Sequence, residues 1–361
     1  MTAPTARIPT LDGWRALSIL LVIGGHLVNY RFLEGDKSAL AGYLAVLGVK
    51  VFFVISGFLI AGLAINEEAA TGTLSMTGFY RRRIFRILPA YFVYLGTVLA
   101  LSLSGWISQA PAGVGWASVF ICNAPSLDCG WFVGHTWSLA YEEQFYLLFP
   151  LLFVLTPRAR KAPLFAAIHV FLAVTPVLTL LVLPNTPQWS TYRTIASHFG
   201  CISAGVLFAH YRDGLAAPGK YRSVLSACAA LCVAACVVVA SGAVGHLSYQ
   251  IRIAIEALVL PLSIAWLILR ATVSRGYFSA MLDWPPLRYV GKISFSLYLW
   301  QQLFTASPSI SPPFSALWLI PAAVLSYHLI EQPMVKLGRR SRKTRPKSRE
   351  DGPSTADAAR P

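Results

Sequence analysis

The sequence predicts an all-α, polytopic membrane protein with about ten transmembrane helices. Of its 361 residues, 56% are hydrophobic and only 12% are charged, whereas a soluble domain carries about 25% charged residues. The apolar residues form long runs near the length of a membrane-spanning helix. The 30 lysine and arginine residues gather at the ends of these runs and near the C-terminus. That pattern is typical of membrane topology and argues against a nucleic-acid-binding surface.

Each predicted span is near the length that a helix needs to cross a bilayer at about 1.5 Å per residue. In order, the spans are residues 14–31, 40–64, 86–105, 137–155, 162–183, 196–211, 223–243, 251–269, 289–305 and 315–332. The first and the sixth are short. A further apolar run, 114–121, is either a half-buried helix or part of a loop. We find no internal repeat and no second, soluble domain.

The distribution of positive charge predicts that both termini are cytoplasmic. With the N-terminus inside, 25 lysine and arginine residues lie on the inner side and four on the outer side, and Lys50 lies within a span. The four outer residues are Arg31, Lys37, Arg193 and Arg252. Residues 1–338 then form the membrane domain, and 339–361 form a basic cytoplasmic tail that we expect to be disordered near anionic headgroups.

Two of the six cysteines, Cys122 and Cys129, lie in a polar loop between the third and fourth spans. The charge pattern places this loop outside the cytoplasm, where disulfides persist. A disulfide and two free thiols are both compatible with the sequence. No cysteine or histidine has a convincing metal partner at ligand spacing, so we predict no metal site.

An ionisable residue within a span costs free energy and is therefore a functional candidate. The first span contains Arg15 and His26, which are eleven residues apart. That spacing places them on one helix face, about 16 Å apart along the axis. A neutral imidazole can take a proton from a hydroxyl group, which makes His26 a candidate base. The alternative is a structural histidine that hydrogen-bonds to a neighbouring helix.

The segment FYRRRIFRILPAY carries Arg83 and Arg86 on one helix face, just before Pro89. Guanidinium groups at this position can hold the phosphates of a nucleotide-like donor. The alternative is a topology signal that contacts lipid headgroups.

The segment HTWSLAYEEQFY places Ser138, Glu142 and Tyr146 four residues apart, so they share a helix face. Glu142 could orient His26 or Arg31, or bind an acceptor. Trp137, Tyr141 and Tyr146 could stack on a sugar ring. The alternative is an interfacial aromatic belt with a structural carboxylate.

In their order along the chain, these motifs resemble the acyltransferase-3 family of integral membrane O-acyltransferases. LDGWRALSILLVIGGH matches the family's arginine–histidine signature, and RRRIFR matches its Arg-x-x-Arg signature. HTWSLAYEEQFY matches its Ser-Leu-x-x-Glu-x-x-x-Tyr signature, and GVKVFFVISGFLI its second helix. GKISFSLYLWQQ and LSYHLIEQPM resemble its last two helices. The resemblance covers residue 8 to about residue 338.

The resemblance implies an enzyme of the cell membrane that takes an acyl group, often acetyl, from a cytoplasmic acyl-CoA. The acceptor is a hydroxyl of a carbohydrate or a glycosylated product. His26 activates that hydroxyl or carries the acyl group transiently, with Glu142 as the second catalytic residue. We assign donor binding to Arg15, Arg83 and Arg86, and acceptor binding to Trp137, Ser138 and Tyr146. Acetyl-CoA or another acyl-CoA is a substrate, and no bound cofactor is expected.

One residue departs from the family pattern. Many members have an acidic residue where this chain has Lys50, and a lysine cannot replace a carboxylate in orienting a histidine. Either that carboxylate is dispensable here, or Glu142 or Asp36 supplies the charge.

A different class of function is a carrier or flippase that moves a glycolipid or polysaccharide fragment without chemistry. Ten helices with buried charges suit a carrier as well as an enzyme. Transporters often consist of two related halves, and we find no such internal similarity. A donor-to-acceptor path from a basic inner rim to His26 favours the enzyme.

Overall fold

The computed structural model describes residues 8–31, 37–183, 187–217, 219–240, 253–274, 276–305 and 313–340. All regular structure in these ranges is helical, with no strand among them. Most of the expected tail, from 341 onward, lies outside the described residues.

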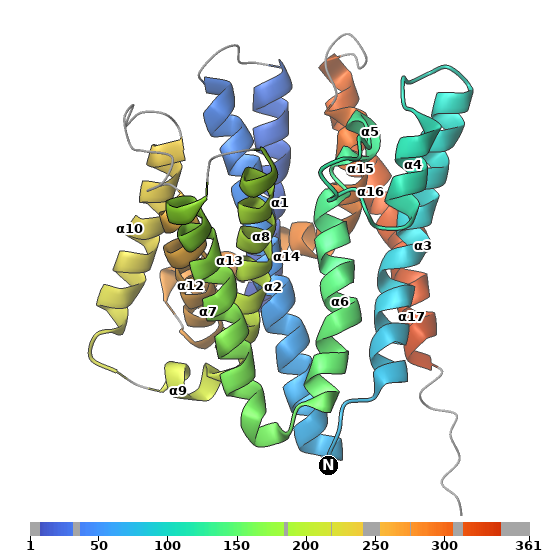
Figure 1. Ribbon diagram of the computed structural model, residues 1–361. Coiled ribbons are helices and arrows are strands. Elements are labelled where there is room, and N and C mark those ends of the chain that lie inside the picture. Colours follow the sequence, from blue (N-terminus) through green and yellow to red (C-terminus); the bar gives the residue numbers. More distant parts are fainter. Residues whose placement is uncertain are drawn as a thin grey trace, which may run out of the picture.

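The long helices run in alternating directions along the chain (Figure 1). They are α1 (Pro9–Arg31), α2 (Lys37–Thr71), α3 (Met76–Leu103), α6 (Trp137–Leu155), α7 (Arg158–Val182), α8 (Pro187–His210), α10 (Arg222–Ala240), α12 (Leu260–Val273) and α15 (Ser294–Phe304). The shorter helix α16 (Leu319–Ser326) follows α15. Shorter elements connect or extend them: α4 (Pro111–Ser118), α5 (Trp131–Gly134), α9 (Arg212–Ala216), α13 (Tyr277–Leu282), α14 (Pro285–Lys292) and α17 (Gln332–Arg340). A 3-10 helix, η2 (Pro313–Trp318), and two π-helical turns, η1 (Ile255–Val259) and η3 (Tyr327–Glu331), complete the list.

The two ends of the helix bundle differ in character. We call the end that carries α4 and α5 the disulfide end, because the connection between α4 and α5 contains a disulfide between Cys122 and Cys129. We call the opposite end, with the α2–α3 connection and α9, the basic end, after the arginines at the start of α3 (Figure 1). The disulfide that the sequence left open is therefore present.

Seven helices among the described residues are long and apolar enough to cross a membrane. They correspond to seven of the predicted spans, and the prediction of an all-α, multi-pass membrane protein is confirmed. The other three predicted spans correspond to α8, to α14 and α15, and to the elements from η2 to α17. Ten crossings and cytoplasmic termini remain predictions.

Some boundaries differ from the predicted ones. Helix α3 begins at Met76 rather than at residue 86, because Ser75 caps it by accepting a hydrogen bond from the Gly78 backbone. The arginine cluster therefore lies within the helix. The predicted span 289–305 is divided at Ile293 into α14 and α15. The apolar run 114–121 includes part of α4, a short helix in which Val114 and Ala117 are buried.

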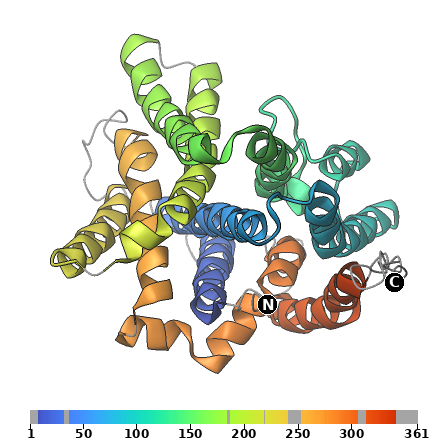
Figure 2. The ribbon, with the colours of Figure 1, turned by 90° about the horizontal axis from the view of Figure 1, so that it is seen from below.

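Helix α2 lies at the centre of the bundle, with α1 and α8 packed on either side of it (Figure 2). Phe53, Val54 and Ile60 of α2 are almost completely buried. By contrast, leucines and valines on the outer faces of α6, α7 and α10 are exposed; Leu148 of α6 and Val182 of α7 are examples. An apolar outer surface of this kind suits contact with lipid chains.

Candidate active site

Two cavities lie end to end between α1, α2, α6 and α15. The arginine cavity, nearer the basic end, has a volume of about 170 Å³, and the histidine cavity has about 230 Å³. Polar groups that line the arginine cavity include Arg15, Arg83, Arg86, Ser138, Glu142 and Tyr146. Those that line the histidine cavity include His26, Trp131, His135, Trp137 and Gln302. All eight predicted site residues therefore line one of the two cavities.

Close packing of α1 against α2 positions Arg15 and His26. A Cβ atom added to Gly25 would lie 2.8 Å from the Ala45 backbone nitrogen, and one added to Gly48 would lie 2.8 Å from a Val22 methyl group. Only glycine allows this approach, as is common where membrane helices pack. Because the two helices touch, the face that carries Arg15 and His26 meets the face of α2 that lines both cavities.

The His26 imidazole is held by a helix far away in the sequence. Its Nδ1 lies 2.8 Å from Oε1 of Gln301 on α15, a side chain with no exposed surface. Because an amide oxygen only accepts hydrogen bonds, Nδ1 carries the proton, and this tautomer has its lone pair on Nε2. The Trp131 ring lies against the imidazole, with 6.1 Å between the ring centroids. His26 is thus an oriented histidine at a cavity wall, and its neutral form presents the unprotonated Nε2 that a general base requires.

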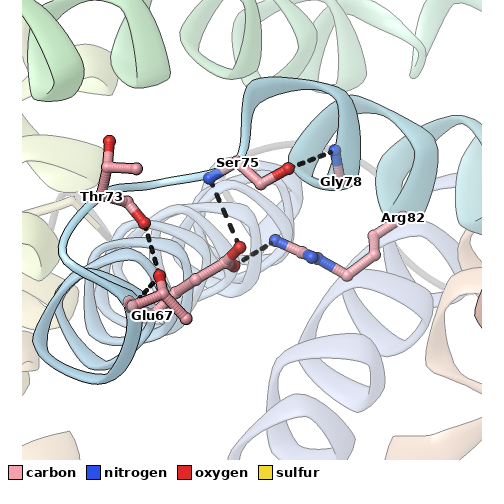
Figure 3. Close-up of polar contacts among 6 residues, drawn as sticks. Glu67, Thr73, Ser75, Gly78 and Arg82 are labelled. Carbon is pink, nitrogen blue, oxygen red and sulfur yellow. Dashed lines mark hydrogen bonds and ion pairs between the residues drawn. The ribbon is translucent and has the colours of Figure 1, made fainter. Parts of the chain in front are cut away.

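Neighbouring arginines on α3 have different environments. Arg82 donates to Glu67 Oε2 at 2.8 Å, and the same carboxylate accepts from the Ser75 backbone, so this pair ties the end of α2 to the start of α3 (Figure 3). Arg83 points into the arginine cavity, where its guanidinium lies 5.0 Å from the centre of the Tyr146 ring. Arg86 lines the same cavity one turn later. Among the described residues, neither Arg83 nor Arg86 forms an ion pair with a carboxylate.

Glu142 and Tyr146 belong to the arginine cavity. The Tyr146 hydroxyl donates to Glu142 Oε2 at 3.1 Å and lies 2.5 Å from the Ser56 hydroxyl of α2. The Glu142 carboxylate also interacts electrostatically with Arg15 and Arg83. Orienting His26 was one of the alternatives considered for Glu142, but Glu142 has arginines of the other cavity as neighbours, and the side chain that contacts His26 is Gln301.

A second buried carboxylate faces the arginines from the C-terminal part of the chain. Glu331, at the end of η3, accepts a hydrogen bond from Ser296 at 3.1 Å and interacts electrostatically with Arg86 and Arg15. Arg15 in turn donates to the Ser294 hydroxyl at 3.3 Å. The three arginines therefore lie between two carboxylates, which offsets part of the cost of holding positive charge within a membrane protein.

Ser138 and Trp137 are adjacent residues that serve different cavities. Ser138 lines the arginine cavity, and its hydroxyl lies 2.6 Å from that of Tyr298 on α15. The Tyr298 hydroxyl donates to the His135 carbonyl at 2.7 Å. Trp137 lines the histidine cavity together with Trp131, so two indole rings are available there to stack on an acceptor.

Lys50 does not take part in either cavity. Its ammonium group is 3% exposed and lies 2.8 Å from Glu256 in η1. The lysine therefore faces away from His26, and the Glu256 carboxylate balances its charge. Of the two alternative partners considered for His26, Glu142 lies in the other cavity and Asp36 lies outside the described residues.

Sequence reasoning missed Gln301, Tyr298 and Glu331. Each lies within a segment that resembled the family's last two helices, yet nothing in its local spacing indicated a role. A buried glutamine and a buried glutamate in predicted spans are the signal that could have identified two of them.

Comparison with known proteins identifies relatives along almost the whole chain. The acyltransferase domain family matches residues 8–327. The peptidoglycan O-acetyltransferase OatA of Listeria monocytogenes is 29% identical over 92% of this chain and 56% of its own length. The putative peptidoglycan O-acetyltransferase YrhL of Bacillus subtilis shows the same identity and coverage. A putative O-acetyltransferase of Staphylococcus aureus is 38% identical over 41% of this chain and 25% of its own length.

The chain spans about half the length of the first two relatives. No solved structure matches. The family match covers most of the sequence and includes the arginine and histidine motifs that line the two cavities. The chain therefore belongs to the acyltransferase-3 family of integral membrane acyltransferases.

Proposed function

We propose that this protein is an O-acyltransferase of the cell membrane that moves an acyl group, acetyl in the first instance, from a cytoplasmic acyl-CoA to a carbohydrate hydroxyl. The observation that carries the proposal is the end-to-end arrangement of an arginine cavity and a histidine cavity between the same four helices. The names of the relatives support a peptidoglycan sugar as the acceptor.

The arginine cavity suits the donor. Coenzyme A carries phosphates, and guanidinium groups bind phosphates through paired, charge-assisted hydrogen bonds. Arg83 and Arg86 line the cavity without an ion-pair partner among the described residues, and Arg15 lines it from α1. Glu142 and Tyr146 then act on the donor side by positioning these arginines, and Ser138 belongs to the same side.

The histidine cavity suits the acceptor. Trp137 and Trp131 provide flat surfaces for a sugar ring, and His26 takes the proton from the attacking hydroxyl. A carbon–oxygen bond forms at the acyl carbonyl, the carbon–sulfur bond of the thioester breaks, and coenzyme A leaves as a thiolate that then takes up a proton. Gln301 keeps the proton on Nδ1, so that Nε2 receives the hydroxyl proton.

The test is release of coenzyme A from acetyl-CoA by membranes that contain the protein, with soluble peptidoglycan fragments as the acceptor. We expect His26→Ala, inserted at the wild-type level, to lose activity about 100-fold or more, because general base catalysis contributes about that much. His169→Ala is the matched control, since His169 is another histidine within a membrane-spanning helix but bonds Ser203 on α8, outside both cavities.

Equal activity of His26→Ala and wild type would overturn the assignment of His26 as the base. A wild type that releases no coenzyme A with any acyl-CoA, yet moves a labelled glycan fragment across the membrane of a vesicle, would favour the carrier instead.

A further inference from the structure

The two cavities meet at Val49 and Tyr298, the two residues that line both of them. On α2 the histidine cavity is lined from Gly42 to Val49 and the arginine cavity from Val49 to Leu63. At about 1.5 Å per residue, Gly42 and Leu63 are about 32 Å apart, close to the thickness of the bilayer's hydrocarbon core. In series, the cavities therefore extend over the depth of a membrane, with a single junction between them.

Three other helices show the same order. On α1, Arg15 lines the arginine cavity and His26 the histidine cavity. On α6, which runs the other way, Trp137 lines the histidine cavity and Ser138 begins the stretch that lines the arginine cavity. On α15, the change occurs at Tyr298 itself. The junction is therefore a property of the whole bundle at one depth.

The junction is held in place on both sides. Tyr298 is 7% exposed, and its hydroxyl is fixed by Ser138 at 2.6 Å and by the His135 carbonyl at 2.7 Å. The Phe52 ring lies edge-on to the Tyr298 ring, with 6.4 Å between the ring centroids. Val49 is 6% exposed and β-branched, so its side chain has little rotational freedom.

The chemistry of the lining changes toward the junction. Phe52 and Phe53 follow Val49 on α2 and line the arginine cavity together with Tyr298, whereas Arg83 and Arg86 line it from α3. A donor whose phosphates bind Arg83 and Arg86 would extend its uncharged thioester arm toward these apolar side chains. The acyl group, at the end of that arm, would then meet Val49 and Tyr298.

We propose that Val49 and Tyr298 select the length of the acyl group, an assignment that rests on the proposed function. The thioester carbonyl lies at the junction, where the acceptor hydroxyl reaches it from the histidine cavity. The new carbon–oxygen bond forms as the carbon–sulfur bond breaks, His26 takes the hydroxyl proton, and the thiolate of coenzyme A remains in the arginine cavity. An acetyl group fits against the two side chains, and each added methylene meets them.

The experiment changes the volume at the junction and measures acyl preference. Wild type, Val49→Ala and Val49→Ile are compared at equal insertion with acetyl-, propionyl- and butyryl-CoA, by release of coenzyme A in the presence of peptidoglycan fragments. Val54→Ala is the matched control, because Val54 is a fully buried valine of α2 that lines neither cavity.

We expect Val49→Ala to raise kcat/KM for propionyl-CoA relative to acetyl-CoA about tenfold or more, since one methylene in a tight apolar pocket discriminates by about that factor. Val49→Ile should shift the ratio the other way, and Val54→Ala should leave it at the wild-type value.

Two results would overturn the assignment while leaving the proposed function intact. One is a wild type that uses butyryl-CoA as readily as acetyl-CoA. The other is an acyl ratio that stays the same in both Val49 variants, or changes equally in Val54→Ala, while acetyl transfer continues. If the wild type releases no coenzyme A from any of the three donors, the proposed function fails and the assignment fails with it.

Discussion

The arginine run at the start of α3 shows how one position decides the role of a side chain. Arg82 and Arg83 are adjacent and chemically identical, but successive residues of a helix point about 100° apart. Arg82 is therefore paired with Glu67 at the α2–α3 connection, whereas Arg83 lies over Tyr146 inside the arginine cavity.

This contrast gives a matched pair of conservative substitutions. Arg83→Lys keeps the charge but loses the planar fork that binds a phosphate through two hydrogen bonds. We expect KM for acetyl-CoA to rise about tenfold, because a charge-assisted hydrogen bond contributes roughly 1.5–3 kcal/mol. Arg82→Lys should leave KM within about twofold of wild type, because its partner is Glu67 and lies outside the cavity. Steady-state kinetics with the two variants inserted equally would refute the donor assignment if both raised KM alike.

Residue spacing predicted which side chains share a helix face, but not which helices meet. The separation of eleven residues between Arg15 and His26 placed both on the face of α1 that lines the two cavities. The partner of His26, Gln301, is 275 residues further along the chain. Helical periodicity relates residues of one helix only, so it could not predict this contact. For the same reason it could not predict that Glu142 lies with the arginines rather than with His26, because that depends on how the helices pack.

Among the helices, α2 both lines the two cavities and carries a buried ion pair. One face of the helix lines both cavities from Gly42 to Leu63. Another face carries Lys50, which pairs with Glu256 in the π-helical turn η1. Such turns interrupt an α-helix over a single turn. This one brings the Glu256 carboxylate to Lys50, which is buried in α2.

The Lys50–Glu256 pair predicts a specific pattern of stability. Lys50→Met should destabilise the protein by roughly 3 kcal/mol, because it leaves the Glu256 carboxylate, which is only 18% exposed, without its partner. Adding Glu256→Gln should recover much of that loss, since the second charge is then removed as well. Thermal unfolding of the purified protein in detergent measures both effects. Additive losses in the double variant would show that the two residues do not act as a pair.

At the scale of the whole molecule, the bundle gives the chain two chemically different ends. The disulfide end carries a bond that persists in oxidising compartments, and the basic end carries the arginines that favour the cytoplasm. The two observations are independent of each other and support the same orientation. Composition and charge predicted the all-α, multi-pass architecture from the sequence, because the bilayer constrains segment length and charge directly. The orientation remains a prediction.

Orientation can be measured with a thiol reagent that does not cross membranes. In a variant without the four free cysteines, Ser108→Cys, in the connection before α4, should react in cells whose outer barriers have been removed but whose membrane is intact. Asp213→Cys on α9 should react only after the membrane is opened. Both positions are exposed. Labelling of Asp213→Cys in intact cells would reverse the predicted topology.

The junction between the two cavities also has a consequence for the leak of protons across the membrane. A continuous column of water through the bundle would let protons follow the membrane potential, at a loss of about 2.3 kcal/mol per charge for each 100 mV. Val49 and Tyr298 place an aliphatic side chain and a hydrogen-bonded ring at the point where the two cavities meet. An acyl group carries no charge, so its transfer at the junction requires no electrical work. In the proposed reaction the charged coenzyme remains in the arginine cavity, so no charge has to pass the junction while the bond is formed.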